Sequence, residues 1–242
     1  MALPKLNTIE YFTTLPVSGE EVKYRPFTVG EQKVLLEALE AEEVKTIANT
    51  VINLVDACCI LQDAKLNVRD LSNTDLEYLF LQVRIKSVGE VTKIVLGCEK
   101  QPECEATTVV DVDLLTVEVI GKQAEDNKIM ITDNVGLTLQ VPSFSEVQGL
   151  IENNMELKTQ DIFDILSQCI ETIFDQDDVH QRTDFTSKEL MDFIDELSIE
   201  QFNVVMKWFD DLPKLVKDVE YNCSKCNHPN TVRLEGIQNF FG

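Results

Sequence analysis

Two cysteines, Cys223 and Cys226, lie in the stretch Leu215-Val-Lys-Asp-Val-Glu-Tyr-Asn-Cys-Ser-Lys-Cys-Asn-His-Pro-Asn-Thr-Val-Arg-Leu-Glu235. On each side of them is a run of alternating apolar and polar residues. Alternation with a period of two predicts β-strands, so we expect a hairpin whose turn carries both cysteines. A Cys-x-x-Cys turn of this kind is typical of one half of a zinc-ribbon site. Because structural zinc takes four ligands in a tetrahedron, the turn predicts a second pair of ligands elsewhere in the chain.

Cys98 and Cys104 are the candidates for that second pair, since they lie in a polar turn between two β-prone runs, within Lys93-Ile-Val-Leu-Gly-Cys-Glu-Lys-Gln-Pro-Glu-Cys-Glu-Ala-Thr-Thr-Val-Val-Asp-Val. Their Cys-x5-Cys spacing is longer than the usual zinc-ligand spacing of about two to four residues. The residues leave several arrangements open: one ion shared by all four thiolates, an ion at the second turn with other ligands, His228 in place of one thiolate, or a disulfide.

The other cysteines favour a reducing compartment. Cys58, Cys59 and Cys169 lie in apolar runs with helical spacing, where they are expected to be small buried hydrophobic residues, and the total of seven cysteines is odd. The N-terminus has no apolar signal core, and no stretch of eighteen apolar residues occurs in the sequence. We therefore expect a soluble, intracellular protein with no membrane partner.

The charge balance narrows the class of partner. The 242-residue chain has 44% hydrophobic residues, enough for a sizeable core, and 43 acidic against 21 basic residues give a net charge of −22. Such a charge repels phosphate backbones, and the sequence has no basic stripe with interleaved aromatic residues. Nucleic-acid binding is therefore not expected, and a basic or mixed-charge protein is the expected partner.

The remaining patterns alternate between hairpins and helices. Residues 9–15 and 21–27 read as a hairpin with Gly19 in its turn, and capping boxes begin at Thr28, Thr186 and Ser198. The predicted helices cover 28–42, 44–61, 72–85 and 159–175, and two more begin at the capping boxes of Thr186 and Ser198 and end before Pro213. The predicted strands in the middle of the chain cover 115–120, 128–132 and 137–141.

These elements predict an α+β fold with an N-terminal hairpin plus helices, a zinc-ribbon-like pair of β-hairpins, a small middle β region and a helical C-terminal half. The predicted domains are an N-terminal hairpin and helical unit at 1–90, the zinc-ribbon-like hairpins at 91–112 and 215–242, and an inserted strand and helical region at 113–214.

Catalysis finds little support in the residues. Neither His180 nor His228 lies in a nucleophile–base or zinc-protease motif, and the sequence has no glycine-rich phosphate loop. The run Asp175-Gln-Asp-Asp178 lacks the glycine and final glutamate of a calcium-binding loop, so it is expected to be a solvated helix end. We expect a protein that is not an enzyme and has no catalytic or organic-cofactor-binding residue.

Several segments resemble the baseplate hub assembly proteins of T4-like (T-even-type) tailed phages and their cyanophage relatives. The resemblance rests on Leu3-Pro-Lys-Leu-Asn-Thr, Tyr24-Arg-Pro-Phe-Thr-Val-Gly-Glu31 and Asp75-Leu-Glu-Tyr-Leu-Phe-Leu-Gln-Val-Arg-Ile-Lys-Ser-Val-Gly89. It continues in Phe185-Thr-Ser-Lys-Glu-Leu, Ser198-Ile-Glu-Gln-Phe202, Tyr221-Asn-Cys-Ser-Lys-Cys and Leu234-Glu-Gly-Ile-Gln-Asn-Phe-Phe241, so it spans nearly the whole chain in order.

The resemblance implies a late-expressed factor that helps to build the central hub of a contractile-tail baseplate in the host cytoplasm, through contacts with hub or tape-measure proteins. One alternative is a permanent structural subunit of the virion baseplate. An alternative of another class is an acidic zinc-ribbon adaptor in transcription. Phe240 and Phe241 at the chain end are expected to be buried, either against the protein's own helices or in a pocket of a partner.

Overall fold

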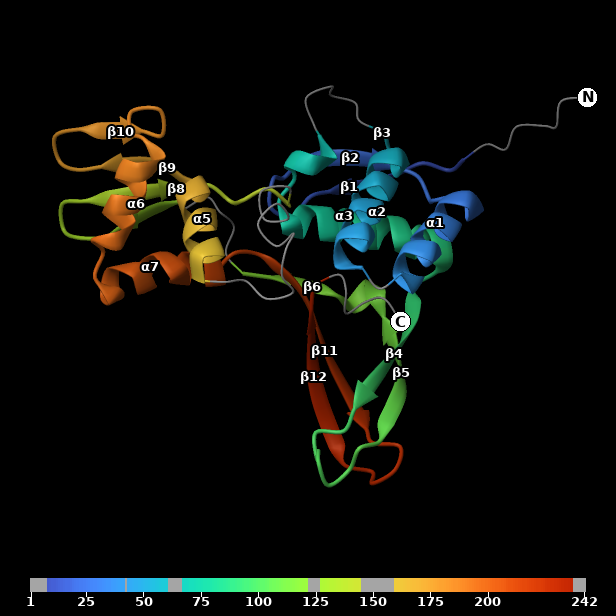
Figure 1. Ribbon diagram of the computed structural model, residues 1–242. Coiled ribbons are helices and arrows are strands. Elements are labelled where there is room, and N and C mark those ends of the chain that lie inside the picture. The colour runs from blue at the N-terminus through green and yellow to red at the C-terminus, as the bar shows by residue number, and fades with distance from the viewer. Residues whose placement is uncertain (1–7, 42, 61–66, 122–126, 145–158, 237–242) are drawn as a thin grey trace, which may run out of the picture. The chain divides into compact units, whose positions relative to one another are not determined.

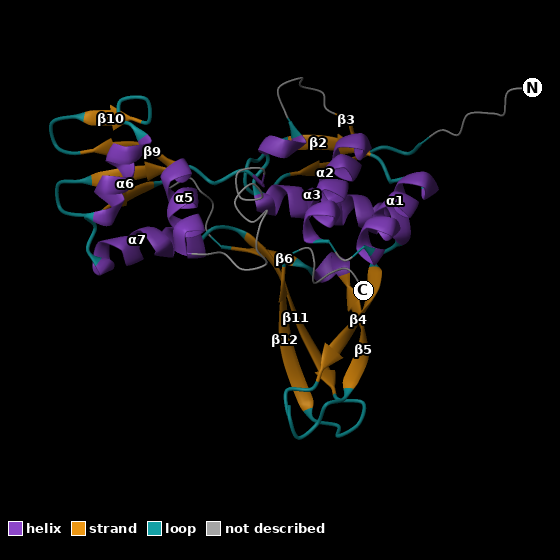
Figure 2. Ribbon diagram, in the orientation of Figure 1, coloured by secondary structure: helices purple, strands orange, loops and turns teal. Residues whose placement is uncertain are grey.

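The computed structural model describes residues 8–41, 43–60, 67–121, 127–144 and 159–236. These residues contain six α-helices and four small antiparallel sheets, so the α+β class is confirmed (Figure 2). The chain forms two compact units, which we describe separately. Unit 1 comprises residues 1–68, 74–120 and 214–242, and unit 2 comprises residues 69–73 and 121–213. The three domains expected from the sequence, at 1–90, at 91–112 with 215–242, and at 113–214, remain a prediction.

In unit 1, the residues that the structure describes form three helices and three sheets (Figure 1). Its elements are β1 (Tyr11–Thr14), β2 (Glu21–Tyr24), α1 (Val29–Glu40), α2 (Val44–Cys58), β3 (Cys59–Ile60), α3 (Asn73–Val88), β4 (Val91–Gly97), β5 (Thr107–Asp113), β6 (Glu118–Ile120), β11 (Lys214–Asn222) and β12 (Pro229–Glu235).

The predicted N-terminal hairpin is present as β1 and β2, and Gly19 in its turn has the positive φ, 71°, that glycine adopts without strain. The turn is fixed from outside. Asp75 near the start of α3 is 1% exposed, and its two carboxylate oxygens accept hydrogen bonds from the backbone N–H groups of Val17 (2.8 Å) and Ser18 (3.0 Å). A buried carboxylate is stabilised by such donors, so Asp75 fixes the turn against α3.

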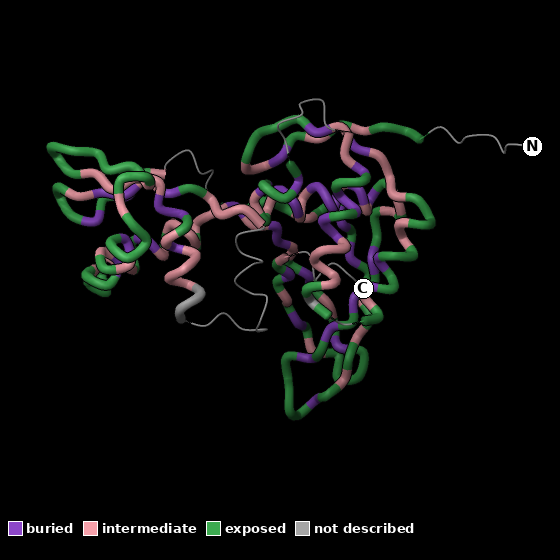
Figure 3. The backbone as a smooth tube through the Cα atoms, turned by 45° about the horizontal axis from the view of Figure 1, so that its top comes forward, coloured by how far each residue is buried: buried purple, intermediate pink, exposed green. Residues whose placement is uncertain are grey.

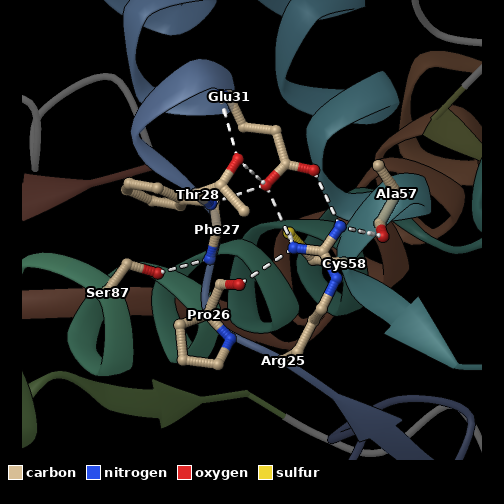
Figure 4. Close-up of polar contacts among 8 residues, drawn as sticks. All are labelled: Arg25, Pro26, Phe27, Thr28, Glu31, Ala57, Cys58 and Ser87. Carbon is tan, nitrogen blue, oxygen red and sulfur yellow. Dashed lines mark hydrogen bonds and ion pairs between the residues drawn. The ribbon is translucent and has the colours of Figure 1, made fainter. Parts of the chain in front are cut away.

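Arg25 joins the beginning of α1 to the end of α2 (Figure 4). Its guanidinium donates two hydrogen bonds to the Glu31 carboxylate, at 2.7 and 3.0 Å, and one to the Ala57 carbonyl at 2.8 Å. Glu31 is also the acidic member of the predicted capping box with Thr28. The hydrogen bond from Arg25, followed by that from Thr28, lowers the pKa of Glu31 to about 2.

The helix predicted over 44–61 ends earlier than expected. The backbone N–H of Arg25 donates to the Cys58 carbonyl at 2.9 Å, and β3 then pairs with β2. Carbonyl groups at the end of a helix need partners from outside the helix, and here Arg25 supplies them. Cys58 is buried as expected, whereas Cys59 lies half-buried in β3.

Two long hairpins complete unit 1. β4 pairs with β5 from Val91↔Asp113 to Gly97↔Thr107, and β11 pairs with β12 from Val216↔Glu235 to Asn222↔Pro229. They lie side by side in Figure 1 and share a core with α3. Its buried members are Leu81, Ile85, Ile94, Leu96, Val112, Leu114, Leu215, Val219 and Leu234.

The strand predicted over 115–120 is shorter in the structure. Residues Leu114–Thr116 form a 3₁₀ turn, because the Asp113 carboxylate accepts the backbone N–H of Leu115 at 3.0 Å. β6 follows and pairs with β11, with Ile120 opposite Lys214. The chain therefore leaves unit 1 and returns to it at neighbouring positions of one antiparallel pair.

The described residues of unit 2 form a four-stranded antiparallel sheet, in the strand order β10-β9-β8-β7, together with three helices. Its elements are β7 (Lys128–Met130), β8 (Gly136–Leu139), α5 (Thr159–Cys169), β9 (Ile170–Phe174), β10 (Val179–Gln181), α6 (Ser187–Asp195) and α7 (Ile199–Asp210). Both predicted capping boxes are present, at Thr186 with Glu189 and at Ser198 with Gln201. Leucines and isoleucines of the sheet and helices form one buried core.

The helix predicted over 159–175 is present only in its first part, and the helical C-terminal half is not confirmed. α5 ends at Cys169, and Ile170–Phe174 form a strand that pairs with both β8 and β10. Three of the five residues of this segment, Ile170, Thr172 and Ile173, are β-branched, which favours a strand between two partners. Asp175 therefore lies in a β-turn, where its carboxylate accepts the N–H groups of Asp177 and Asp178 at 2.9 Å.

The loops that join β4 to β5 and β11 to β12 are mostly exposed (Figure 3), although Cys98, Cys104 and Cys223 are buried. Phe240 and Phe241 lie outside the described residues. Within the described part of the chain, no helix combines the length and the apolar character that crossing a bilayer requires.

Candidate metal centre

The structure brings Cys98, Cys104, Cys223 and Cys226 together where the ends of the two long hairpins meet. All four sulfur atoms lie within 4.8 Å of one another. Cys98 Sγ is 3.7 Å from Cys226 Sγ, and Cys104 Sγ is 3.8 Å from Cys223 Sγ, so each close pair joins one hairpin to the other. The juxtaposition expected from the sequence is therefore present, over sequence separations of more than a hundred residues.

The distances have a chemical meaning. Zinc–sulfur bonds of about 2.3 Å in a regular tetrahedron place the sulfur atoms about 3.8 Å apart. A disulfide bond is about 2.05 Å long, well below the observed separations, and all seven cysteines are free thiols in the structure. The spacing of the sulfurs thus fits four ligands around one ion rather than two covalent bridges.

Two tight turns present the sulfurs. In the second hairpin, the backbone N–H of Cys223 donates to the His228 carbonyl at 2.9 Å, and Asn227, with a φ of 57°, donates to the Cys223 carbonyl at 3.0 Å. Asparagine tolerates this left-handed conformation better than most residues. In the first hairpin, Cys98 and Cys104 donate to the carbonyls of Ala106 and Lys100 at 3.1 and 3.0 Å.

The electrostatics of the cluster favour a cation. The backbone N–H groups of Cys226 and Lys225 lower the pKa of Cys223 to about 6. At Cys98 the N–H of Lys100 acts in the same direction, but burial and the three neighbouring cysteines outweigh it and raise the pKa to about 12. Four thiolates this close cannot all ionise unaided, whereas a divalent ion would stabilise all four.

Polar contacts fix the two hairpins to each other around the sulfurs. Ser224 donates from its backbone to Thr108 Oγ1 and from its hydroxyl to the Thr107 carbonyl, both at 3.0 Å. On the other side, Glu99 donates its N–H to Asn230 Oδ1 at 2.8 Å and accepts the Thr231 N–H at 2.8 Å. The Tyr221 hydroxyl also donates to the Gly97 carbonyl.

These cross-hairpin contacts were not predicted. Glu99, Ser224 and Asn230 look like ordinary turn residues in the sequence, and nothing in the pattern indicates which turn each would meet. In the structure, burial marks Asn230 as a structural residue. It is only 3% exposed, and its amide also donates to the His228 carbonyl at 2.7 Å. The four clustered ligand candidates do not include the His228 side chain.

Cys226 is the exposed member of the cluster, whereas the other three cysteines are buried. All four positions around an ion could be filled by protein sulfur, which is the arrangement of a structural site and leaves no place for substrate. Fold and site together define an α+β protein in which two hairpins from distant parts of the chain meet at four cysteines.

The chain belongs to the family described as T4 bacteriophage base plate proteins, because the model of that family matches residues 8–242. This match covers nearly the whole chain and confirms the resemblance found in the sequence segments. It connects the protein with the phage baseplate and with the other proteins of that assembly. No curated protein and no solved structure matches the chain.

Proposed function

We propose that the protein is an assembly factor for the central hub of a phage baseplate, acting by protein–protein contacts in the host cytoplasm. Membership of the base plate family over residues 8–242 is the observation that carries this proposal. The expected partners are hub or tape-measure proteins. With a net charge of −22, the protein would be steered toward basic surfaces on such partners. The role needs no catalytic step, and we propose none.

We also propose that Cys98, Cys104, Cys223 and Cys226 bind one structural Zn²⁺ ion, in a zinc-ribbon-like arrangement of the two hairpins. The sulfur separations of 3.7 and 3.8 Å and the cross-hairpin hydrogen bonds support it. Bound zinc would stabilise the four thiolates and so join the two hairpins. The ion would then serve the fold of unit 1, and through it any partner surface that unit 1 presents.

A permanent structural subunit of the virion baseplate is the second candidate, since the family description fits a subunit as well as a helper. The third reading, an acidic zinc-ribbon adaptor in transcription, fits less well. Family membership favours the baseplate, and the net charge of −22 opposes approach to nucleic acid.

Quantitative mass spectrometry of purified virions and of hub assembly intermediates separates the first two candidates. For an assembly factor we expect the protein in the intermediates and little or none in finished particles. A stoichiometric copy number in finished virions would contradict the assembly-factor proposal and support the structural subunit. Baseplate proteins measured in the same samples serve as the internal standard.

A further inference from the structure

Unit 2 contains a cavity between the β9–β10 hairpin and α6, and neither the metal centre nor the proposed assembly role accounts for it. Its volume is about 310 Å³, near the lower limit of about 300 Å³ for small-ligand pockets. A cavity of this size suits a single large side chain. Its walls include Ile173 of β9 and Leu190 and Phe193 of α6, so much of its lining is apolar.

Two carboxylates and one imidazole add polar groups to these walls: Asp184, Glu189 and His180. Backbone and hydroxyl donors fix both carboxylates. Asp184 Oδ2 accepts the N–H of Gln181 at 2.7 Å, and Glu189 Oε2 accepts the N–H and the hydroxyl of Thr186, both at 2.8 Å. Each carboxylate keeps lone pairs for a further donor.

Among the described residues, neither carboxylate has a basic partner. No lysine or arginine of the described segments forms an ion pair with Asp184 or Glu189. The donors from Thr186 lower the pKa of Glu189, which keeps this side chain ionised near neutral pH. The cavity therefore combines apolar walls with fixed negative charge, a combination that selects a cation with an aliphatic stem.

The pair of carboxylates favours a guanidinium over an ammonium group. Phe185, which also lines the cavity, already has the guanidinium carbon of Arg182 5.4 Å from the centre of its ring, so the preference rests on the carboxylates. A planar guanidinium can also donate to two carboxylates at once, whereas an ammonium is a point charge.

A side chain fits this place better than an added β-strand. β10 is the edge strand of its sheet and would be the position for strand addition. However, the Gln181 N–H on β10 already donates to Asp184, so the edge does not offer this donor to an incoming strand. The carboxylate therefore protects the edge and lines the cavity at the same time.

We propose that this cavity binds an arginine side chain presented by a partner protein. The inference rests on the proposed function in one respect, namely that the protein acts through protein contacts. It does not depend on whether the partner belongs to the hub or on whether the protein remains in the virion. The walls of Ile173, Leu190 and Phe193 would contact the methylene stem, and Asp184 and Glu189 would accept the guanidinium hydrogen bonds.

The test is an NMR titration of the full-length, ¹⁵N-labelled protein with N-acetyl-arginine amide, compared with the uncharged N-acetyl-norleucine amide. We expect saturable shifts of the backbone amides of His180, Phe185 and Leu190 with the arginine probe, weaker at high salt. The double variant Asp184→Asn/Glu189→Gln keeps side-chain acceptors for Gln181 and Thr186 but removes both charges. It should weaken binding by about tenfold or more.

The matched control is Asp192→Asn/Asp195→Asn, which makes the same charge change at exposed positions of α6 away from the cavity lining. This control should bind the arginine probe as the wild type does. The proposal is overturned if norleucine amide binds as tightly as arginine amide, if the Asp184/Glu189 variant binds undiminished, or if no shift occurs up to the solubility limit of the probe. The virion measurement above is independent of this result, so either proposal can fail alone.

Discussion

The cysteine end of the long hairpins and the core of unit 2 bury very different side chains. In unit 2, Leu137, Leu139, Leu166 and Leu190 are at most 1% exposed and pack with aromatic residues of α5, α6 and α7. At the cysteine end, three buried cysteines have Ala106 as their one partly buried hydrophobic neighbour in the described structure.

The difference shows two ways in which a small region of a protein can be stabilised. Burial of a leucine side chain stabilises a fold by roughly 1.5–3 kcal/mol, and small side chains such as alanine and cysteine bury too little apolar surface to do the same. Unit 2 has enough large apolar residues to hold its sheet and helices together. The cysteine end depends instead on hydrogen bonds between its two turns and, we propose, on a metal ion. Loss of the ion should therefore affect one unit and spare the other.

The largest expected effect is removal of the metal by Cys223→Ser. Purified wild-type protein should contain about one Zn²⁺ per chain, and the variant about none, as elemental analysis would measure. Structural zinc in small domains contributes an apparent binding free energy of about 10–16 kcal/mol, so amide hydrogen exchange should rise sharply in β4, β5, β11 and β12 but not in unit 2.

Cys59→Ser is the matched control, because Cys59 lies in β3 outside the cluster. It should leave the zinc content unchanged. Absence of zinc from freshly reduced wild-type protein would contradict the proposal that the four cysteines bind a metal ion. Full zinc content in Cys98→Ser, with unchanged affinity, would show that the first hairpin supplies no essential ligand.

The converse experiment is Leu190→Ala in the core of unit 2. Leu190 is fully buried, and truncation of a buried leucine costs about 2–5 kcal/mol through lost contacts and the resulting cavity. We expect lower stability of unit 2 in urea unfolding, with zinc content unchanged. Release of zinc by this variant under native conditions would contradict the separation of the two units.

A smaller effect is expected at Glu31, whose pKa is lowered from 4.5 to about 2 mainly by Arg25. A carboxylate with a lowered folded-state pKa stabilises the fold above its unfolded pKa, and this contribution disappears as the pH falls from about 4.5 to 2. Glu31→Gln should therefore be less stable than wild type by roughly 1–2 kcal/mol at pH 6, since solvent screens this partly exposed ion pair. The gap should close near pH 2.

Urea unfolding at a series of pH values measures this gap, and glutamine keeps the side-chain acceptor for Thr28. Glu40→Gln, at an exposed position of the same helix, controls for the change of net charge. A gap that is constant with pH would mean that the ion pair between Arg25 and Glu31 adds nothing to stability.

The smallest expected effect is Ser224→Ala, which removes one hydrogen bond between the two hairpins. Such a bond contributes about 0.5–1.5 kcal/mol, so zinc affinity in a chelator competition should fall by about tenfold at most. A much larger loss would show that the turn contacts, rather than the sulfurs, carry most of the stability of this end.

Local sequence patterns allowed many helices and strands to be predicted. The elements that were predicted incorrectly depend mostly on which strands pair with each other. The capping boxes at Thr28, Thr186 and Ser198 are present because a capping box depends on four consecutive residues. The segment 170–174 was misassigned because its apolar residues, Ile170, Ile173 and Phe174, have helical spacing, whereas pairing with β8 and β10 makes it a strand.

The residues of the candidate metal centre also fall into those that the sequence predicts and those that it does not. The two cysteine pairs could be predicted because each lies in a turn between alternating runs, and tetrahedral coordination requires two pairs. Glu99 and Asn230, which hydrogen-bond across the hairpins, could not be found, because their partners are about 130 residues away in sequence. The Arg25–Glu31 contact lies between these cases: Glu31 was expected as a cap, but its ion pair was not.

The pairing of β6 with β11 has a mechanical consequence. The chain enters unit 2 after Ile120 and returns at Lys214, and these residues are opposite each other in the ladder. A tensile load carried by these two chain segments would thus separate β6 from β11 one residue pair after another, beginning at Ile120–Lys214 and ending at Glu118–Val216. The cysteines follow the opposite end of β11, so they would be the last part of this hairpin to bear the load.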